Sequence, residues 1–254
     1  PLGLDVDSSW AGICDGRSGA AAIAEFDAAA FSTRFSASVK NFSVDGYLEV
    51  RDARRMDPFI QYGMVAGIQA FRDSGYEVTE TNAARIGCAI GSGIGGIGSI
   101  EGTAMLVDQK GPKRISPFFV PGAIINMIAG NLSILYNLQG PNIAVVTACT
   151  TGTHNIGLGA RMIAAGDVDA MLVGGAEMAT TPVGIGGFAA ARALSTIIRH
   201  MEQNAVPALT SYEQRCCSPP SSCSKTNAQT PSACGATSPT NRSIVGAYFL
   251  ARCS

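Results

Sequence analysis

Hydrophobic residues recur along the first three quarters of the chain with a spacing of three or four, which places them on one face of a helix. This spacing is clearest over residues 53–74, where Gly75 ends the pattern, and over residues 123–138. The second stretch is followed by Gly140 and Pro141, and proline cannot continue a helix without losing a backbone hydrogen bond. We therefore predict one long core helix in each stretch.

Short apolar runs alternate with these helical stretches and are typical of buried strands. We predict strands over residues 85–90, 143–146 and 170–173, with helices over 99–108 and 155–165 between them. Strands that alternate with helices pack as a sheet with helices on its faces. The sequence therefore predicts an α/β layered fold.

The last part of the chain breaks this pattern. From Ile197 onward the sequence is rich in Ser, Pro, Thr, Asn and Cys, and all but two of the 30 glycines lie before Thr196. We predict an α/β domain over residues 1–196 and a non-homologous, disordered tail over 197–254. We hypothesise a reading-frame shift or a mis-joined gene model near the boundary. Five of the eight cysteines lie in this tail: Cys216, Cys217, Cys223, Cys234 and Cys253.

A small disulfide or metal module is the alternative interpretation of these five cysteines. No two of them are separated by two residues, and no histidine lies among them, so the usual zinc-site spacing is missing. We therefore predict no metal site.

Composition narrows the class of protein. Hydrophobic residues make up 46% of the 254 residues and charged residues 15%, which is enough apolar material for a substantial core. The 18 basic and 19 acidic residues nearly cancel, so no overall field attracts nucleic acid or an anionic membrane. The chain starts with Pro1, without a leader-like segment or a membrane-spanning apolar stretch, and we expect a cytoplasmic fragment that lacks its true start.

The glycine-rich segment 91–96 formally matches a dinucleotide-binding pattern, because it follows a predicted strand and precedes a predicted helix. That pattern also needs an acidic residue at the end of the next strand. The acid nearest that offset, Asp108, lies in helix-like sequence. We therefore expect a turn whose glycines allow close packing, and no cofactor.

Cys149 is the strongest candidate for chemistry. It lies between an apolar strand and a glycine-containing helix start, on a strand-to-helix turn. Amides at a helix N-terminus favour the thiolate, which is the nucleophilic form of cysteine. The alternative is an inert cysteine that packs as a small hydrophobic residue.

The chain has two histidines, and neither is an evident general base. His154 lies five residues after Cys149, about 140° around the helix, so the two do not share a face. We interpret His154 as a structural histidine that is hydrogen-bonded near the helix. His200 has no motif around it.

The nucleophile segment Val146-Thr-Ala-Cys-Thr-Thr-Gly-Thr-His-Asn-Ile-Gly157 closely resembles that of β-ketoacyl-acyl carrier protein synthases, the elongating type II form in particular. The resemblance covers residues 1–196, with further motifs in the family's order and spacing. These motifs are Gly91-Ser-Gly-Ile-Gly-Gly96, Ile115-Ser-Pro-Phe-Phe-Val-Pro121, Gly174-Gly-Ala-Glu177 and Gly184-Ile-Gly-Gly-Phe-Ala-Ala-Ala-Arg-Ala-Leu-Ser-Thr196.

The resemblance implies the N-terminal half of a thiolase fold, usually a homodimer, and an enzyme of fatty acid biosynthesis. In such enzymes a fatty acyl group passes from acyl carrier protein onto the cysteine and then condenses with malonyl-acyl carrier protein after decarboxylation. Cys149 would hold the acyl thioester, and its backbone amide would be one donor of the oxyanion hole. Ile94 and Phe188 match positions that line the acyl pocket, and Phe119 matches one contributed across the dimer interface. Without the resemblance, the phenylalanines read as ordinary core aromatics.

The sequence also departs from this family. The two histidines that assist condensation lie in His-Gly-Thr and Gly-His motifs, and neither motif is present. A first β-strand, expected before Pro1, and a glycine-rich segment whose phenylalanine guards the pocket are absent as well. We expect a truncated chain that is capable of acyl transfer to Cys149 but not of condensation. The alternatives are a non-catalytic partner subunit like the chain-length factors of polyketide systems, which typically replace the nucleophile, and a functionless product that exposes core surface.

Overall fold

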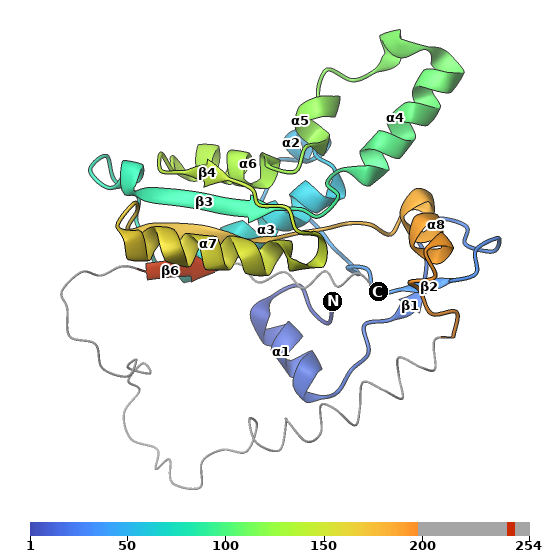
Figure 1. The fold of residues 1–254 in the computed structure, drawn as a ribbon, viewed down its shortest axis with the longest axis horizontal. Coiled ribbons are helices and arrows are strands. Elements are labelled where there is room, and N and C mark those ends of the chain that lie inside the picture. Colours follow the sequence, from blue (N-terminus) through green and yellow to red (C-terminus); the bar gives the residue numbers. More distant parts are fainter. Residues whose placement is uncertain (198–242, 247–254) are drawn as a thin grey trace, which may run out of the picture.

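A computed structural model describes residues 1–197 and 243–246 of the chain. At its centre is a four-stranded parallel sheet with the strand order β4-β3-β5-β6 (Figure 1). Helix α7 covers one face of this sheet, and helices α3 and α6 pack against the other. The predicted α/β layered fold is confirmed for these residues.

The described chain forms these elements in order. The helices are α1 (Val6–Cys14), α2 (Val50–Ala53), α3 (Pro58–Asp73), α4 (Ile97–Lys110), α5 (Phe119–Ala123), α6 (Met127–Tyr136), α7 (Thr151–Ala165) and α8 (Pro182–Ala190), with short 3-10 turns η1 (Ala83–Arg85), η2 (Pro112–Arg114) and η3 (Ala148–Thr150). The strands are β1 (Ala21–Ala22), β2 (Phe35–Ser36), β3 (Ile86–Gly91), β4 (Asn142–Ile143), β5 (Ala170–Gly175) and β6 (Ser243–Gly246). β1 and β2 form a separate antiparallel pair.

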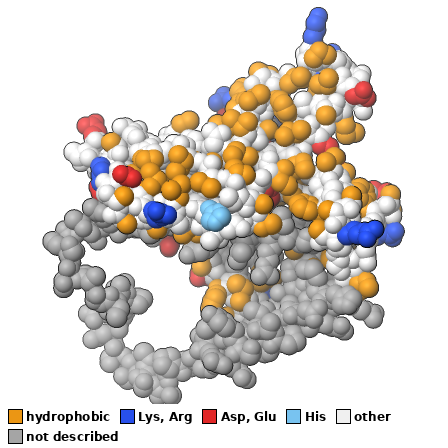
Figure 2. Space-filling view, in the orientation of Figure 1, with side chains coloured by type: hydrophobic (Ala, Val, Ile, Leu, Met, Phe, Trp, Pro, Cys, Tyr) orange, Lys and Arg blue, Asp and Glu red, His pale blue; other side chains and the backbone are white. Residues whose placement is uncertain are grey.

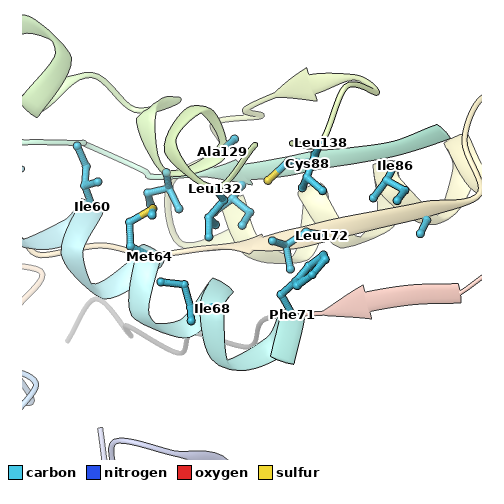
Figure 3. Packing of buried hydrophobic residues seen from close by; sticks show 14 of the residues in the cluster. Ile60, Met64, Ile68, Phe71, Ile86, Cys88, Ala129, Leu132, Leu138 and Leu172 are labelled. Atoms are coloured by element: carbon cyan, nitrogen blue, oxygen red, sulfur yellow. The ribbon is translucent and has the colours of Figure 1, made fainter. Parts of the chain in front are cut away.

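Strands β3 and β5 are buried on both faces, and their alternating side chains supply two cores. Ile86, Cys88 and Leu172 point to the α3 and α6 side (Figure 3). Met171 and Val173 belong to the second core, on the α7 side. This period-two division of side chains fixes the register of six residue pairs between β3 and β5.

The predicted helix over residues 53–74 is wrong at its start, because the chain forms two helices there. Pro58 is the first residue of α3, and the side chain of Asp57 caps it by accepting a hydrogen bond from the Phe59 amide at 3.2 Å. Proline at the first helical position after an aspartate cap is a recognised start signal. The same Asp57 carboxylate accepts hydrogen bonds from the amide and hydroxyl of Ser99, so it also ties α3 to the start of α4.

Two further predicted elements differ in extent. The predicted helix 123–138 is confirmed only over α6, because α5 ends at Ala123 and Ile124 after it has extended backbone angles. The predicted strand 143–146 shortens to β4, because the amide and carbonyl of Val145 bond to the Asn155 side chain rather than to a neighbouring strand. Local side-chain hydrogen bonds thus end strand pairing just before the Cys149 turn.

Within the predicted tail, Ser243–Gly246 pairs in parallel with β5 as strand β6. The described residues do not include His200 or the five tail cysteines. The domain division at residue 196 and the frame shift near it stay predictions. In the described part of the chain, no helix is both long and apolar enough to cross a membrane.

Candidate active site around Cys149

The carboxyl ends of β3, β4 and β5 meet at one edge of the sheet, because the three strands are parallel. The chain leaves β3 through the glycine turn 91–96, leaves β4 toward Cys149, and leaves β5 toward Glu177. In open α/β sheets, ligands bind outside the carboxyl ends of the strands. The three segments that carry candidate chemistry therefore converge at the expected place.

Cys149 lies in the middle of the 3-10 turn η3, immediately before α7, and its side chain is exposed with a free thiol. The residue before it, Ala148, has a φ of 52°, in the left-handed region that non-glycine residues rarely adopt. Such a conformation costs about 1 kcal/mol for an L-residue. The predicted turn before a helix is confirmed, and its backbone is locally strained at Ala148, next to Cys149.

The backbone of this turn offers hydrogen-bond donors to a ligand. The Thr150 amide donates to the Thr147 carbonyl at 3.1 Å, so the amides of Ala148 and Cys149 precede the first hydrogen bond inside the turn. These donors lie at the N-terminal end of the 15-residue helix α7, where the helix dipole favours negative charge. The arrangement suits stabilisation of a negatively charged oxygen beside Cys149.

Asn155, which the sequence interpretation missed, fixes the segment that leads to Cys149. Its fully buried side chain accepts a hydrogen bond from the Val145 amide at 3.0 Å and donates to the Val145 carbonyl at 3.0 Å and the Thr151 carbonyl at 2.9 Å. The hydroxyl of Thr151 also accepts a hydrogen bond from the Thr147 amide at 3.0 Å. The available signal was two polar residues, four positions apart, on the apolar face of a helix against a buried strand.

His154 has the structural role that its spacing predicts. Its Nδ1 atom lies 2.7 Å from the hydroxyl oxygen of Thr147, at the start of the Cys149 turn. The side chain is exposed and bonds to this hydroxyl rather than to the thiol of Cys149. His154 therefore supports the turn from outside.

The glycine turn after β3 packs directly against the Cys149 turn. A Cβ atom on Gly93 would lie 2.8 Å from Glu177 Oε2 and 3.2 Å from the Ala148 Cα atom, and one on Gly91 would lie 2.6 Å from the Val145 carbonyl oxygen. Side chains at these positions would push the two turns apart. This supports the close-packing interpretation of the glycines over a nucleotide site.

Glu177 occupies the anion-binding position of the glycine turn. Its Oε2 atom accepts a hydrogen bond from the Ile94 amide at 2.8 Å, and its Oε1 atom accepts one from the Ser92 hydroxyl at 3.0 Å. Burial raises the pKa of this carboxyl above its usual range, and the hydrogen bonds from Ile94 and Ser92 act in the opposite direction. The amide that a phosphate would need is thus already bonded to a side chain.

The three predicted pocket residues lie on three different segments. Ile94 belongs to the glycine turn and is therefore next to the Cys149 turn. Phe119 begins α5 and Phe188 lies in α8, both half-buried, and these two helices lie well apart (Figure 1). The pocket roles of all three remain predictions.

Cys88 is a clear contrast to Cys149 within the same domain. It is fully buried in β3, and burial raises the pKa of its thiol to about 12. A thiol in that environment stays protonated and packs as a small hydrophobic residue. Of these two cysteines, Cys149 is the one whose exposed turn position suits nucleophilic attack.

Comparison with protein families gives a match over residues 1–205 to the model of the β-ketoacyl synthase N-terminal domain. A 3-oxoacyl-[acyl-carrier-protein] synthase 2 of Vibrio harveyi is 60% identical over 196 residues, which cover 77% of this chain and 47% of the relative. The chain therefore spans about half the length of the curated relatives that it matches.

Comparison with solved structures also finds ketosynthases. A β-ketoacyl synthase from Burkholderia phymatum STM815 superposes with a TM-score of 0.65 and 25% identity, over 75% of this chain and 47% of the other. A ketosynthase bound to a hexaketide and in complex with its type II polyketide acyl-carrier protein superposes with a TM-score of 0.56 and 27% identity, over 59% and 43% of the two chains. The layered architecture is thus the thiolase-like fold of ketosynthases.

Proposed function

Because the chain belongs to the β-ketoacyl synthase family, we propose that Cys149 accepts a fatty acyl group from acyl carrier protein in 3-oxoacyl-[acyl-carrier-protein] synthesis. The observation that carries the proposal is the exposed thiol of Cys149 on a strained turn at the N-terminus of α7. The names of the curated relatives support the substrate class. The complex of a related ketosynthase with its acyl-carrier protein supports the partner.

The proposed step is a thioester exchange. The Cys149 thiolate attacks the carbonyl carbon of the acyl-carrier thioester, and the carbonyl oxygen becomes an oxyanion. The amide of Cys149 is proposed as one donor to this oxyanion. Collapse forms the new bond from the Cys149 sulfur to the acyl carbon, breaks the bond to the carrier sulfur, and releases the carrier thiolate, which takes up a proton.

The residues proposed to contact the acyl group are Ile94, Phe119 and Phe188. Ile94 is the best supported of the three, because the glycine turn that carries it touches the Cys149 turn and its side chain is partly exposed. Phe119 belongs to an apolar surface on α4, α5 and α6, where hydrophobic side chains are visible over the upper part of the molecule (Figure 2). Its exposed hydrophobic residues are Ile100, Met105, Phe118, Val120, Ile134 and Leu135.

This apolar surface supports the proposed homodimer. Ile134 alone is 79% exposed, and clustered apolar side chains of this kind mark interaction surfaces. Phe119 would then contribute to the site of a second copy. A reducing cytoplasm suits a nucleophilic thiol, and neither Cys88 nor Cys149 forms a disulfide.

Condensation is not proposed for this chain by itself. The second half-reaction joins the acyl group to malonyl-acyl carrier protein after decarboxylation, and the family performs it with two histidines in motifs that this sequence lacks. His154, which bonds to Thr147, does not replace them. We therefore propose that the chain accepts an acyl group but lacks the two histidines that complete condensation.

Intact mass spectrometry after incubation with acyl-carrier protein thioesters tests the proposal. We expect an increase in mass by one acyl group that is absent from Cys149→Ala and present in the control Cys88→Ala, whose thiol is buried. A folded wild-type protein that gains no acyl group would reject acyl transfer and favour a non-catalytic subunit. A 3-oxoacyl product from this chain alone would contradict the proposed loss of condensation, and sedimentation of the same sample tests the dimer.

A further inference from the structure

Glu177 is a carboxylate with no assigned role at the edge of the sheet where Cys149 lies. It follows β5 by two residues, and its side chain is mostly withdrawn from solvent. A half-buried carboxylate is costly unless its oxygens accept hydrogen bonds. Both oxygens of Glu177 do so, and the glycine turn after β3 supplies a donor to each of them.

The bonds from Glu177 form a short network through that turn. Ser92, which is 1% exposed, donates its hydroxyl hydrogen to Glu177 Oε1 and accepts the Gly95 amide on the same oxygen at 3.0 Å. Ile94 donates its amide to Glu177 Oε2. A single carboxylate therefore holds three consecutive parts of the turn: the hydroxyl at its start, the amide at its centre and, through Ser92, the amide at its end.

The held turn is also the surface on which the nucleophile turn rests. Gly93 lies between Glu177 on one side and Ala148 on the other, with both within 3.2 Å of where its Cβ would be. Ala148 is the strained residue next to Cys149. A strained conformation persists only where its surroundings hold it in place, and the glycine turn is part of those surroundings.

We propose that Glu177 is a positioning residue, which fixes the Ser92–Gly95 turn against Ala148 and so places Ile94 and the Cys149 turn for acyl transfer. The catalytic consequence rests on the function proposed above, whereas the hydrogen-bonded arrangement does not. Glu177 acts through Ile94 and Ala148 and makes no contact with the acyl group itself. The carboxylate fills the place of a phosphate in the superficially similar nucleotide-binding turn.

Substitutions at Glu177 test this role. Glu177→Gln keeps an acceptor for the Ile94 amide and a polar group for Ser92, so we expect acylation within about threefold of wild type. Glu177→Ala removes both acceptors, and we expect acylation slower by about tenfold, because small displacements of reacting groups have large effects on rate. Alkylation of Cys149 by iodoacetamide, a small reagent that needs no acyl pocket, should change much less. Asp169→Asn, at the other end of β5, is the matched control and should acylate as wild type.

Hydrogen exchange of the peptide that covers residues 92–96 gives a readout that does not depend on activity. We expect the Ile94 amide to exchange faster in Glu177→Ala, and Glu177→Gln to restore its protection. Unchanged exchange and unchanged acylation in Glu177→Ala would overturn the positioning role. If wild type fails to acylate but exchange responds as expected, the proposed function falls while the structural arrangement of Glu177 stands.

Discussion

The two ends of the central strands are fastened in opposite ways. At the amino end, Arg85 forms an exposed ion pair with Asp169, with nitrogen-to-oxygen distances of 2.7 and 3.2 Å, and also donates to the carbonyls of Gly166 and Asp167. At the carboxyl end, the half-buried Glu177 accepts hydrogen bonds from the Ser92 hydroxyl and the Ile94 amide. The amino end is therefore held by an ion pair, and the carboxyl end by a carboxylate that is hydrogen-bonded to a hydroxyl and an amide.

We infer that the contacts at the amino end of the strands serve stability, whereas those at the carboxyl end position the residues proposed for chemistry. Exposed ion pairs stabilise little and tolerate movement, because water and salt screen them. Buried hydrogen bonds are directional, and leaving one unmade is costly. The end that carries Cys149 includes buried hydrogen bonds of this kind, from the Asn155 side chain to Val145 and Thr151. Three predictions test this contrast.

The largest effect is expected from Asn155→Ala at the carboxyl end. The substitution leaves the amide and carbonyl of Val145 and the carbonyl of Thr151 without their side-chain partner. We expect a loss of roughly 2–4 kcal/mol in the free energy of unfolding, measured by urea denaturation, and acylation slower by at least about tenfold.

His154→Ala is the matched control for that prediction, because His154 is the preceding residue on α7 but its side chain is exposed. It loses only the contact with the Thr147 hydroxyl. We expect a change below about 0.5 kcal/mol in unfolding free energy. Equal losses in the two variants would show that burial of the Asn155 network contributes nothing beyond an ordinary surface contact.

The sequence predicted the carboxyl end well where the signal was local. The apolar runs gave β3 and β5, and the position of Cys149 between a strand and a helix gave its turn. The sequence did not reveal the partners that hold this turn. The spacing of Thr151 and Asn155 marks two polar residues on the apolar face of a helix, but the backbone groups that Asn155 and Glu177 bind do not follow from residue spacing.

The amino end and the loops were harder to predict for a different reason. The pairing of Arg85 with Asp169 joins residues 84 positions apart and appears only when β3 and β5 lie side by side. The split of the predicted helix 53–74 was readable from Asp57 and Pro58, but the apolar periodicity on both sides hid it. The shortening of β4 depends on Asn155, which competes with a neighbouring strand for the backbone of Val145.

A smaller effect is expected from the titration of Glu177. Burial raises its pKa in the folded protein above the ordinary value of 4.5, so between 4.5 and the raised pKa the folded state binds more protons than the unfolded state. Stability contributed by this group is fully present below pH 4.5 and is lost as pH rises through the folded pKa. Urea denaturation of wild type and Glu177→Gln across this pH window measures the effect. We expect the free energy of unfolding of wild type to fall relative to that of Glu177→Gln as the pH rises. A difference that is constant with pH would mean that Glu177 titrates normally.

The smallest effect is expected at the amino end, from Arg85→Met. The guanidinium and its partner Asp169 are both substantially exposed, so the loss of the ion pair should lower Tm less than Asn155→Ala does, and less still at high salt. Methionine keeps much of the aliphatic length of arginine, which limits the loss of packing. Acylation of Cys149 should remain at the wild-type rate, because Arg85 precedes β3 whereas the Cys149 turn lies beyond the carboxyl ends of the strands. If Arg85→Met slows acylation as much as Glu177→Ala does, the two ends are mechanically coupled through the rigid strands, and the separation of stability from chemistry fails.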